Sequence, residues 1–414
     1  MNTAAINQIP LDQLDVSDPK LYAQDSWRPY FARLRKEAPV NRVSDSPYGP
    51  YWSVSTHGLI KEVDSNHRIF SSAMTWGGVT LERDIDLSYE NFIAMDPPRH
   101  NTQRAAAAPA VGPQNLAKLE SLIRQRAASI LDSLPIGEEF NWVEQVSIEL
   151  TCRMLATLLD FPYEDRHKLT YWTEVANSPP EFVGEGGMSY EERQTAMQDC
   201  ADTFIKMWNE RAAAPPGNDF ISMLAHSGET AKDIFSDPKM MLGNVLLLIV
   251  GGNDTTRNSI SGGVLALNES PDEYQKLRDN PAVIPNMVAE MIRWQTPVIY
   301  MRRTAVADTE LGGKKIAKGD KVVMWYLSGN RDESVFPNAD KLIVDRKNAR
   351  NHVAFGFGIH RCMGNRLAEM QLRVLWEEIM PRFERIEVVG PVQRATNNVM
   401  RTITHVPVVL HPKK

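Results

Sequence analysis

Residues 355–364, Phe-Gly-Phe-Gly-Ile-His-Arg-Cys-Met-Gly, constrain the fold of this chain more than any other segment. They place Cys362 in a glycine-bearing loop, and a helical pattern begins directly after it. Gly358 and Gly364 lack a Cβ atom, so the backbone can turn sharply there and lie close to a flat partner. Amide N–H groups and the dipole at the start of a helix stabilise an anionic sulfur. The segment therefore predicts a cysteine thiolate held in a rigid loop as a ligand; the alternative is a buried structural thiol beside an ordinary turn.

The spacing Phe-x-x-Gly-x-x-x-Cys-x-Gly resembles the cysteine loop of the haem-thiolate cytochrome P450 monooxygenases. The resemblance implies that Cys362 ligates the iron of haem b. Its thiolate would push electron density onto the iron, which favours cleavage of the O–O bond. The resemblance also implies that Phe355 shields the sulfur from water and that His360 contacts a haem propionate. We therefore expect a haem-dependent enzyme that uses O2.

Residues 239–268 form the longest helical pattern, about 30 residues without proline, and contain the sequence Gly-Gly-Asn-Asp-Thr-Thr at 251–256. Each glycine inside a helix costs about 1 kcal/mol relative to alanine, so the pair needs a reason. The Thr255 hydroxyl can bond to the i−4 carbonyl, that of Gly251, and bend the helix. The sequence resembles the oxygen-activation motif of the same family, which implies that Gly251 leaves room beside the haem and that Thr255 and Asp254 deliver protons. The alternative is a solvated Asp254 on a helix whose glycines serve packing.

Glu290 and Arg293 are spaced i, i+3 and share one helix face. Alone, such a pair is typical of a solvated surface. The family resemblance implies instead that the pair is buried beneath the cysteine loop and joined by a second arginine, Arg346. We expect this triad to have a structural role.

Haem propionates are anions and need cationic or N–H partners. The family resemblance implies three such residues besides His360. His100 and Arg104 follow Asp-Pro-Pro at 96–98 with His-x-x-x-Arg spacing, and Arg303 begins the sequence Arg-Thr-Ala.

The expected substrate is apolar, because apolar residues occur on the long helix and after the Glu-x-x-Arg motif. The segments 92–98, 248–258 and 358–369 resemble the soluble bacterial branch of the family that hydroxylates the terminal carbon of medium-chain n-alkanes and fatty acids. A terpenoid or steroid substrate is the alternative, and a haem-binding sensor without turnover is a third reading. Arg83 and Arg302 are candidate anchors for a carboxylate. Residues 184–187 are a candidate hinge of a lid, with a plain exposed turn as the alternative. The residues expected to line the substrate cavity are Leu247, Val250, Val298 and Ile299.

The composition restricts the partners and the compartment. A net charge of −6 disfavours nucleic-acid binding, and three cysteines cannot supply a four-cysteine cluster. The N-terminus has no signal-peptide pattern, and the longest apolar run, 245–250, is too short for a transmembrane anchor. We therefore expect a cytoplasmic protein.

The succession of patterns predicts a mainly α protein with small antiparallel β-sheets, which the resemblance identifies with the cytochrome P450 fold. We expect one haem domain over residues 1–414, with 1–25 as an N-terminal extension. A strand pair is expected over 43–56. Because little chain follows the cysteine loop, we expect electrons from a separate [2Fe–2S] ferredoxin and its NAD(P)H-dependent reductase. The arginines expected on the docking face are Arg361, Arg366 and Arg373; the alternative is that they are ordinary arginines of a helix surface.

Overall fold

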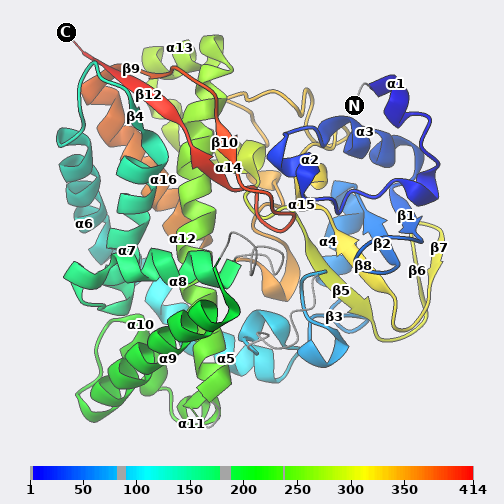
Figure 1. The fold of residues 1–414 in the computed structure, drawn as a ribbon, viewed down its shortest axis with the longest axis horizontal. Coiled ribbons are helices and arrows are strands. Elements are labelled where there is room, and N and C mark those ends of the chain that lie inside the picture. The colour runs from blue at the N-terminus through cyan, green and yellow to red at the C-terminus, as the bar shows by residue number, and fades with distance from the viewer. Residues whose placement is uncertain (1–2, 82–89, 178–187, 236–237, 414) are drawn as a thin grey trace.

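The computed structural model describes residues 3–81, 90–177, 188–235 and 238–413. Figure 1 shows two parts: a larger group of helices on the left, and a smaller part with the main sheet on the right. The predicted class, mainly α with small sheets, is confirmed. No helix in the described ranges combines the length with the apolar character that a bilayer crossing requires.

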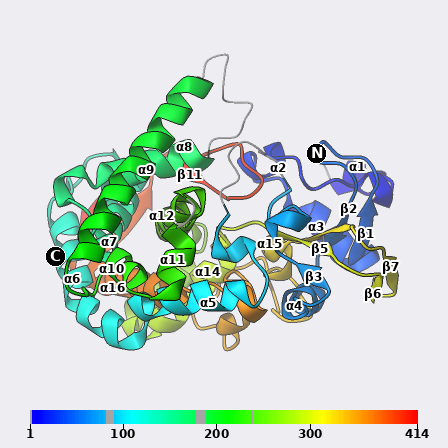
Figure 2. The ribbon, with the colours of Figure 1, turned by 90° about the horizontal axis from the view of Figure 1, so that it is seen from below.

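The predicted long helix is α12 (Pro238–Asn268), which runs through the helical part. It packs against α7 (Glu149–Leu159), α8 (His167–Asn177), α14 (Ile284–Gln295) and α16 (Asn365–Arg382). Figure 2 shows these helices around α12 in a view from below. Because α12 has neighbours on several sides, it is apolar along much of its length, as expected for a core helix.

The other helices belong to both parts (Figure 1). A capping box starts α9, where Ser189 and Glu192 bond reciprocally to each other's backbone N–H groups. The remaining bounds are α3 (Arg28–Glu37), α4 (His57–Ser65), α5 (Arg99–Ala107), α6 (Pro113–Asp132), α9 (Tyr190–Ala213), α10 (Phe220–Ala225), α11 (Glu229–Phe235) and α13 (Pro271–Asp279), with the short α1 (Thr3–Ile6), α2 (Lys20–Ala23) and α15 (Tyr326–Gly329).

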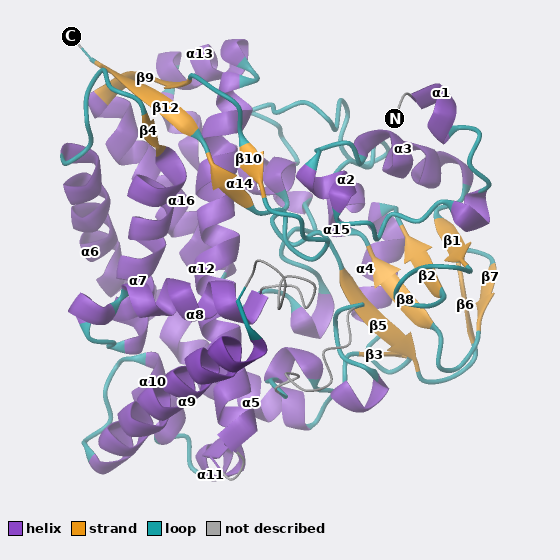
Figure 3. Cartoon of the chain, in the orientation of Figure 1, coloured by secondary structure: helices purple, strands orange, loops and turns teal. Residues whose placement is uncertain are grey.

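The sheets are small and antiparallel, except for one parallel pair, β2 with β8 (Figure 3). The main sheet has the order β1-β2-β8-β5-β3, and the others are β4-β12-β9, β10-β11 and β6-β7. The strands are β1 (Val40–Val43), β2 (Tyr51–Val54), β3 (Phe70–Ser71), β4 (Phe140–Asn141), β5 (Met301–Ala305), β6 (Thr309–Leu311), β7 (Lys314–Ile316), β8 (Lys321–Met324), β9 (Phe383–Val388), β10 (Gln393–Arg394), β11 (Ile403–His405) and β12 (Pro407–Pro412).

The predicted strand pair is present, but its first strand lies earlier than expected. Val40 pairs with Val54 and Val43 with Tyr51, so β1 ends where the prediction began it. The reason is that the pairing begins next to Pro39, whose carbonyl accepts the Ser55 N–H at 3.0 Å.

The N-terminal residues 1–25, expected as an extension of the haem domain, pack onto the folded chain wherever they are described. Ile6, Leu14 and Val16 are buried in a second apolar core with residues of β2, β8 and the segment after α14. Arg33 donates to the carbonyls of Ile6 and Ile9. This segment therefore packs as part of the folded chain.

Candidate functional site

The cysteine loop is shaped by its glycines. Gly356 and Gly358 adopt φ values of +66° and +65°, a region that other residues rarely occupy. A Cβ on Gly358 would lie 2.2 Å from the carbonyl oxygen of Asp64, so only glycine allows the loop to approach α4 this closely. The Cys362 N–H donates to the Phe355 carbonyl at 2.8 Å and closes the loop. Cys362 itself is therefore fixed by backbone geometry.

The Cys362 thiol opens into an internal cavity, and this explains why it is both accessible and deeply placed. Burial raises the pKa of the thiol, while the Gly364 N–H and the charges of Arg104 and Arg361 act in the opposite direction. In the described part of the chain, no three His, Cys, Asp or Glu side chains gather as a metal site.

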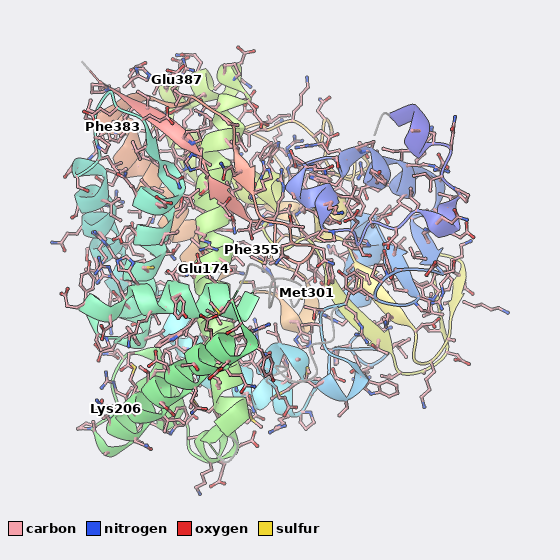
Figure 4. All side chains as sticks on the ribbon, viewed as in Figure 1. Glu174, Lys206, Met301, Phe355, Phe383 and Glu387 are labelled. Carbon is pink, nitrogen blue, oxygen red and sulfur yellow. The ribbon has the colours of Figure 1, made fainter. Side chains whose placement is uncertain are left out.

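The cavity lies between α12 and the cysteine loop. Figure 4 shows two of its lining residues, Phe355 and Met301, near the middle of the molecule. Most lining residues are apolar, and among the described ones the charged side chains are Arg104 and Arg303. The space is therefore suited to a flat apolar group with an anionic edge, together with an apolar substrate.

Gly251 and Gly252 of α12 have different roles. A Cβ on Gly252 would lie 2.7 Å from Leu155 Cδ2, so this glycine permits close packing of α12 on α7. A Cβ on Gly251 would meet nothing within 4 Å, and Gly251 lines the cavity. The Thr255 hydroxyl donates to the Gly251 carbonyl at 2.7 Å, as the sequence predicts, and Thr255 also lines the cavity.

Asp254 is buried, unlike the solvated residue of the alternative reading. Its side chain is 3% exposed and its carboxylate lies 2.9 Å from the Arg257 guanidinium. Arg257 also lies 3.1 Å from Glu174 of α8, whose side chain is 54% exposed and is labelled in Figure 4. Asp254, Arg257 and Glu174 therefore form a chain of charged groups from the interior next to Thr255 to the protein surface.

Unpartnered histidine nitrogens lie beside Arg104 and Arg303. The rings of His100 and His360 are 4.3 Å apart. Within the described residues, His100 Nε2 and both ring nitrogens of His360 are buried without a hydrogen-bond partner. Burial, followed by the charges of Arg303, His100 and Arg104, lowers the pKa of His360 to about 2. Buried donors beside two arginines need an anionic acceptor, and the carboxylates of a haem fit this need.

His67 is a further member of this cluster that the sequence analysis missed. It interacts electrostatically with both His100 and His360, and its Nδ1 is buried without a partner among the described residues. No motif marks His67, because it approaches the other histidines only through the fold.

The predicted triad is buried as one unit. Glu290 and Arg293 have fully buried side chains, and Arg293 makes a bidentate pair with the Glu290 carboxylate at 2.7 and 2.8 Å. Arg346 Nε lies 3.0 Å from both carboxylate oxygens. The two guanidinium groups also donate to the carbonyls of Asn330 and Pro337, so the triad ties α14 to the segment before the cysteine loop.

The structure brings together most of the predicted site residues. Those that line the cavity are Cys362, Phe355, His360, Arg104, Arg303, Gly251, Thr255, Leu247 and Val298. His100 packs against His360, and Asp254 lies behind the cavity wall.

Other predicted residues lie elsewhere. Val250 and Ile299 do not line the cavity, and Ile299 is fully buried in the second core. Arg302 does not face inward as a carboxylate anchor, because its guanidinium donates to the carbonyls of Trp76 and Gly77. Arg83 and the candidate hinge 184–187 lie outside the described residues.

Comparisons with known proteins agree with this geometry. The family model described as cytochrome P450 matches residues 28–407. The chain is 38% identical to linalool 8-monooxygenase of Pseudomonas putida over 97% of this chain and 100% of that protein. It is 30% identical to a steroid C26-monooxygenase of Mycobacterium tuberculosis, over 94% and 91%. The solved structure of cytochrome P450-153 from Novosphingobium aromaticivorans is similar with a TM-score of 0.88 at 44% identity, over 96% of this chain and 100% of that one.

Proposed function

Because the chain belongs to the cytochrome P450 family, a family of haem-thiolate monooxygenases, we propose that it hydroxylates the terminal methyl group of a medium-chain apolar substrate. The substrate is an n-alkane or a fatty acid, the cofactor is haem b, and the oxidant is O2. Electrons come from a [2Fe–2S] ferredoxin and its NAD(P)H-dependent reductase. The observation that carries the proposal is the apolar cavity between Cys362 and α12, which Leu247 and Val298 line.

The names of two relatives support attack at a chain end. Carbon 8 of linalool is a terminal methyl group, and so is carbon 26 of a steroid side chain. Primary C–H bonds are stronger than secondary ones, so terminal hydroxylation requires a cavity that presents the chain end first. The same names also favour a terpenoid or steroid side chain as the second candidate substrate.

Haem, when bound, would supply the activation of O2. Cys362 Sγ would hold its iron, and the histidine and arginine cluster would bind its carboxylates. On the opposite wall, the Thr255 hydroxyl is held by the Gly251 carbonyl at 2.7 Å. We assign Asp254, the neighbouring residue, as the source of the proton for this hydroxyl. Its carboxylate pairs with Arg257, which also pairs with the exposed Glu174.

Replacing Thr255 by alanine should separate NADH consumption from product formation. General acid–base groups contribute about 10²–10⁴-fold, but water can partly replace a hydroxyl, so we expect the product formed per NADH to fall roughly tenfold. NADH is still consumed and hydrogen peroxide accumulates. Thr255→Ser keeps the hydroxyl and is expected to retain most of the product yield. A haem sensor without turnover would show no such loss, and an unchanged yield in Thr255→Ala would exclude this role of Thr255.

A neutral substrate suits the described cavity better than a carboxylate. Arg104 and Arg303 belong to the histidine edge, and Arg302 is occupied by carbonyls of the segment before residue 81. With a surrogate ferredoxin and reductase, we therefore expect octane to give 1-octanol faster than dodecanoic acid gives 12-hydroxydodecanoic acid. Products hydroxylated mainly within the chain, or no product from either compound, would contradict the proposed substrate class and leave the family assignment intact.

Val298→Ala tests whether this side chain directs the chain end. The change widens the cavity, and a methylene-sized difference in an apolar pocket is worth about 1–3 kcal/mol, so the ratio of terminal to subterminal alcohol should fall about tenfold. Gas chromatography of the octanol isomers measures the ratio. Ile299→Val is the matched control, because Ile299 is the next residue but is buried away from the cavity. Equal ratios in the wild type and Val298→Ala would rule out this role.

The proposed docking face is smaller than the sequence suggested. Arg361 and Arg366 are exposed, but Arg373 is paired with Glu120 and Glu377, each at 2.8 Å. Arg361 and Arg366 are therefore the arginines we assign to the ferredoxin contact. Electron transfer should slow as salt rises, because exposed charges are screened within about 10 Å at 0.1 M ionic strength.

A further inference from the structure

Asp64 is a buried acid to which the mechanism above assigns no task. It lies in the last turn of α4 and is 2% exposed. One carboxylate oxygen lies 2.9 Å from the Arg303 guanidinium. The other accepts the Tyr326 hydroxyl at 2.8 Å and the Phe357 N–H at 3.0 Å. The carboxylate thus joins three separate segments of the chain.

The position is an unfavourable one for an acid. The end of a helix carries a partial negative charge, which disfavours a carboxylate in the last turn. Burial raises the pKa of the Asp64 carboxyl, while Arg303, Tyr326 and the Phe357 N–H act to lower it. A charge in such a place persists only when it is paired and fully hydrogen-bonded. The pairing with Arg303 therefore accounts for the presence of Asp64.

The three partners of Asp64 all belong to the haem site. Arg303 and Tyr326 line the cavity, and Phe357 lies in the cysteine loop five residues before Cys362. The same turn of α4 contacts the loop again, because Gly358 packs against the Asp64 carbonyl. Asp64 thus sets the direction of one guanidinium, compensates its positive charge, and holds the loop that carries the ligand.

We propose that Asp64 is a positioning residue that sets the reduction potential of the haem iron by compensating the charge of Arg303. Reduction adds one electron to the iron. A nearby buried anion opposes that addition, whereas an uncompensated Arg303 assists it. Asp64 therefore keeps the potential lower than Arg303 alone would. This inference depends on the haem-thiolate site and not on which substrate the cavity takes.

Spectroelectrochemical titration of the haem-loaded protein tests the proposal. In Asp64→Asn, we expect the one-electron equilibrium to move toward the reduced form by about tenfold, which is about 59 mV more positive. Asp64→Glu keeps the charge and should stay close to the wild type. Asp332→Asn is the matched control. Asp332 is also a buried acid, and it accepts the His57 N–H at the other end of α4, but it does not line the cavity.

Each outcome decides the proposal. The proposal is supported if Asp64→Asn raises the reduction potential and Asp332→Asn does not. In proteins that already carry Arg303→Gln, Asp64→Asn should then leave the potential unchanged. An unchanged potential, equal shifts in both Asn variants, or a shift that persists without Arg303 overturns it. Asp64→Ser is a second neutral variant in case asparagine prevents folding. If neither neutral variant binds haem while Asp64→Glu does, the carboxylate only holds the fold and the proposal fails.

Discussion

Replacing Cys362 by serine is expected to lower product formation by at least about 100-fold, equivalent to about 2.7 kcal/mol of lost transition-state stabilisation. A serine hydroxyl stays protonated where a cysteine can be a thiolate, so it cannot push electron density onto the iron in the same way. The loop should keep its shape, because its closing bond runs between the Cys362 N–H and the Phe355 carbonyl. The absorption spectrum of the haem and the amount of product per haem measure the two effects separately.

Cys152→Ser is the control for this substitution. Cys152 is buried on α7, and its sulfur lies 2.6 Å from the Thr170 hydroxyl, so a serine there keeps a hydrogen-bond partner. We expect Cys152→Ser to bind haem with the wild-type spectrum and to form product at a similar rate. A Cys362→Ser variant that retained more than a tenth of the wild-type rate with an unchanged spectrum would exclude Cys362 as the iron ligand.

Much of this site could be predicted from the sequence, because its defining residues are close together in the chain. The positive φ values of the cysteine loop require glycine, and the Thr255 to Gly251 bond follows from the spacing of one helical turn. The Glu290 and Arg293 pair likewise follows from i, i+3 spacing on one helix. In each case, the residues that define the feature are close together in the chain.

The apolar lining was only partly predictable, because face and register depend on packing. Val298 and Ile299 are neighbours in an extended segment, so their side chains point to opposite sides and only one can face the cavity. In the structure Val298 lines the cavity, and Ile299 is buried in the second core. On α12, Leu247 lies on the cavity stripe with Gly251 and Thr255 at intervals of four residues, whereas Val250 falls to the side of it.

The partners of the buried charges were not predictable, because they come from distant parts of the chain. Asp64 meets Arg303 across 239 residues, and Glu174 meets Arg257 across 83. Single residues of this kind leave no periodic signal. The sequence identifies the residues that take part in the reaction, whereas the fold identifies the charged groups that lie near them and alter their electrostatic environment.

The largest predicted loss of stability follows from Glu290→Gln. Glu290 is fully buried between Arg293 and Arg346, and its replacement leaves two guanidinium cations without the carboxylate that compensates them. Breaking a buried pair in this way costs about 3–5 kcal/mol, against a total stability of about 5–15 kcal/mol for a typical domain. We expect a strongly lowered urea midpoint and poor haem incorporation, measured by circular dichroism and by haem absorbance per protein.

Glu333→Gln is the control for this substitution, because it removes the acidic partner of an arginine outside the triad. Glu333 pairs with Arg35 at 2.8 Å, but its side chain is 58% exposed, and such a pair contributes only about 0–1 kcal/mol. Its urea midpoint should therefore stay near that of the wild type. Because the triad holds the loop and does not reach the cavity, the Glu290→Gln molecules that do bind haem should form product at nearly the wild-type rate per haem. A normal urea midpoint combined with a large loss of activity per haem would instead assign Glu290 a part in the reaction.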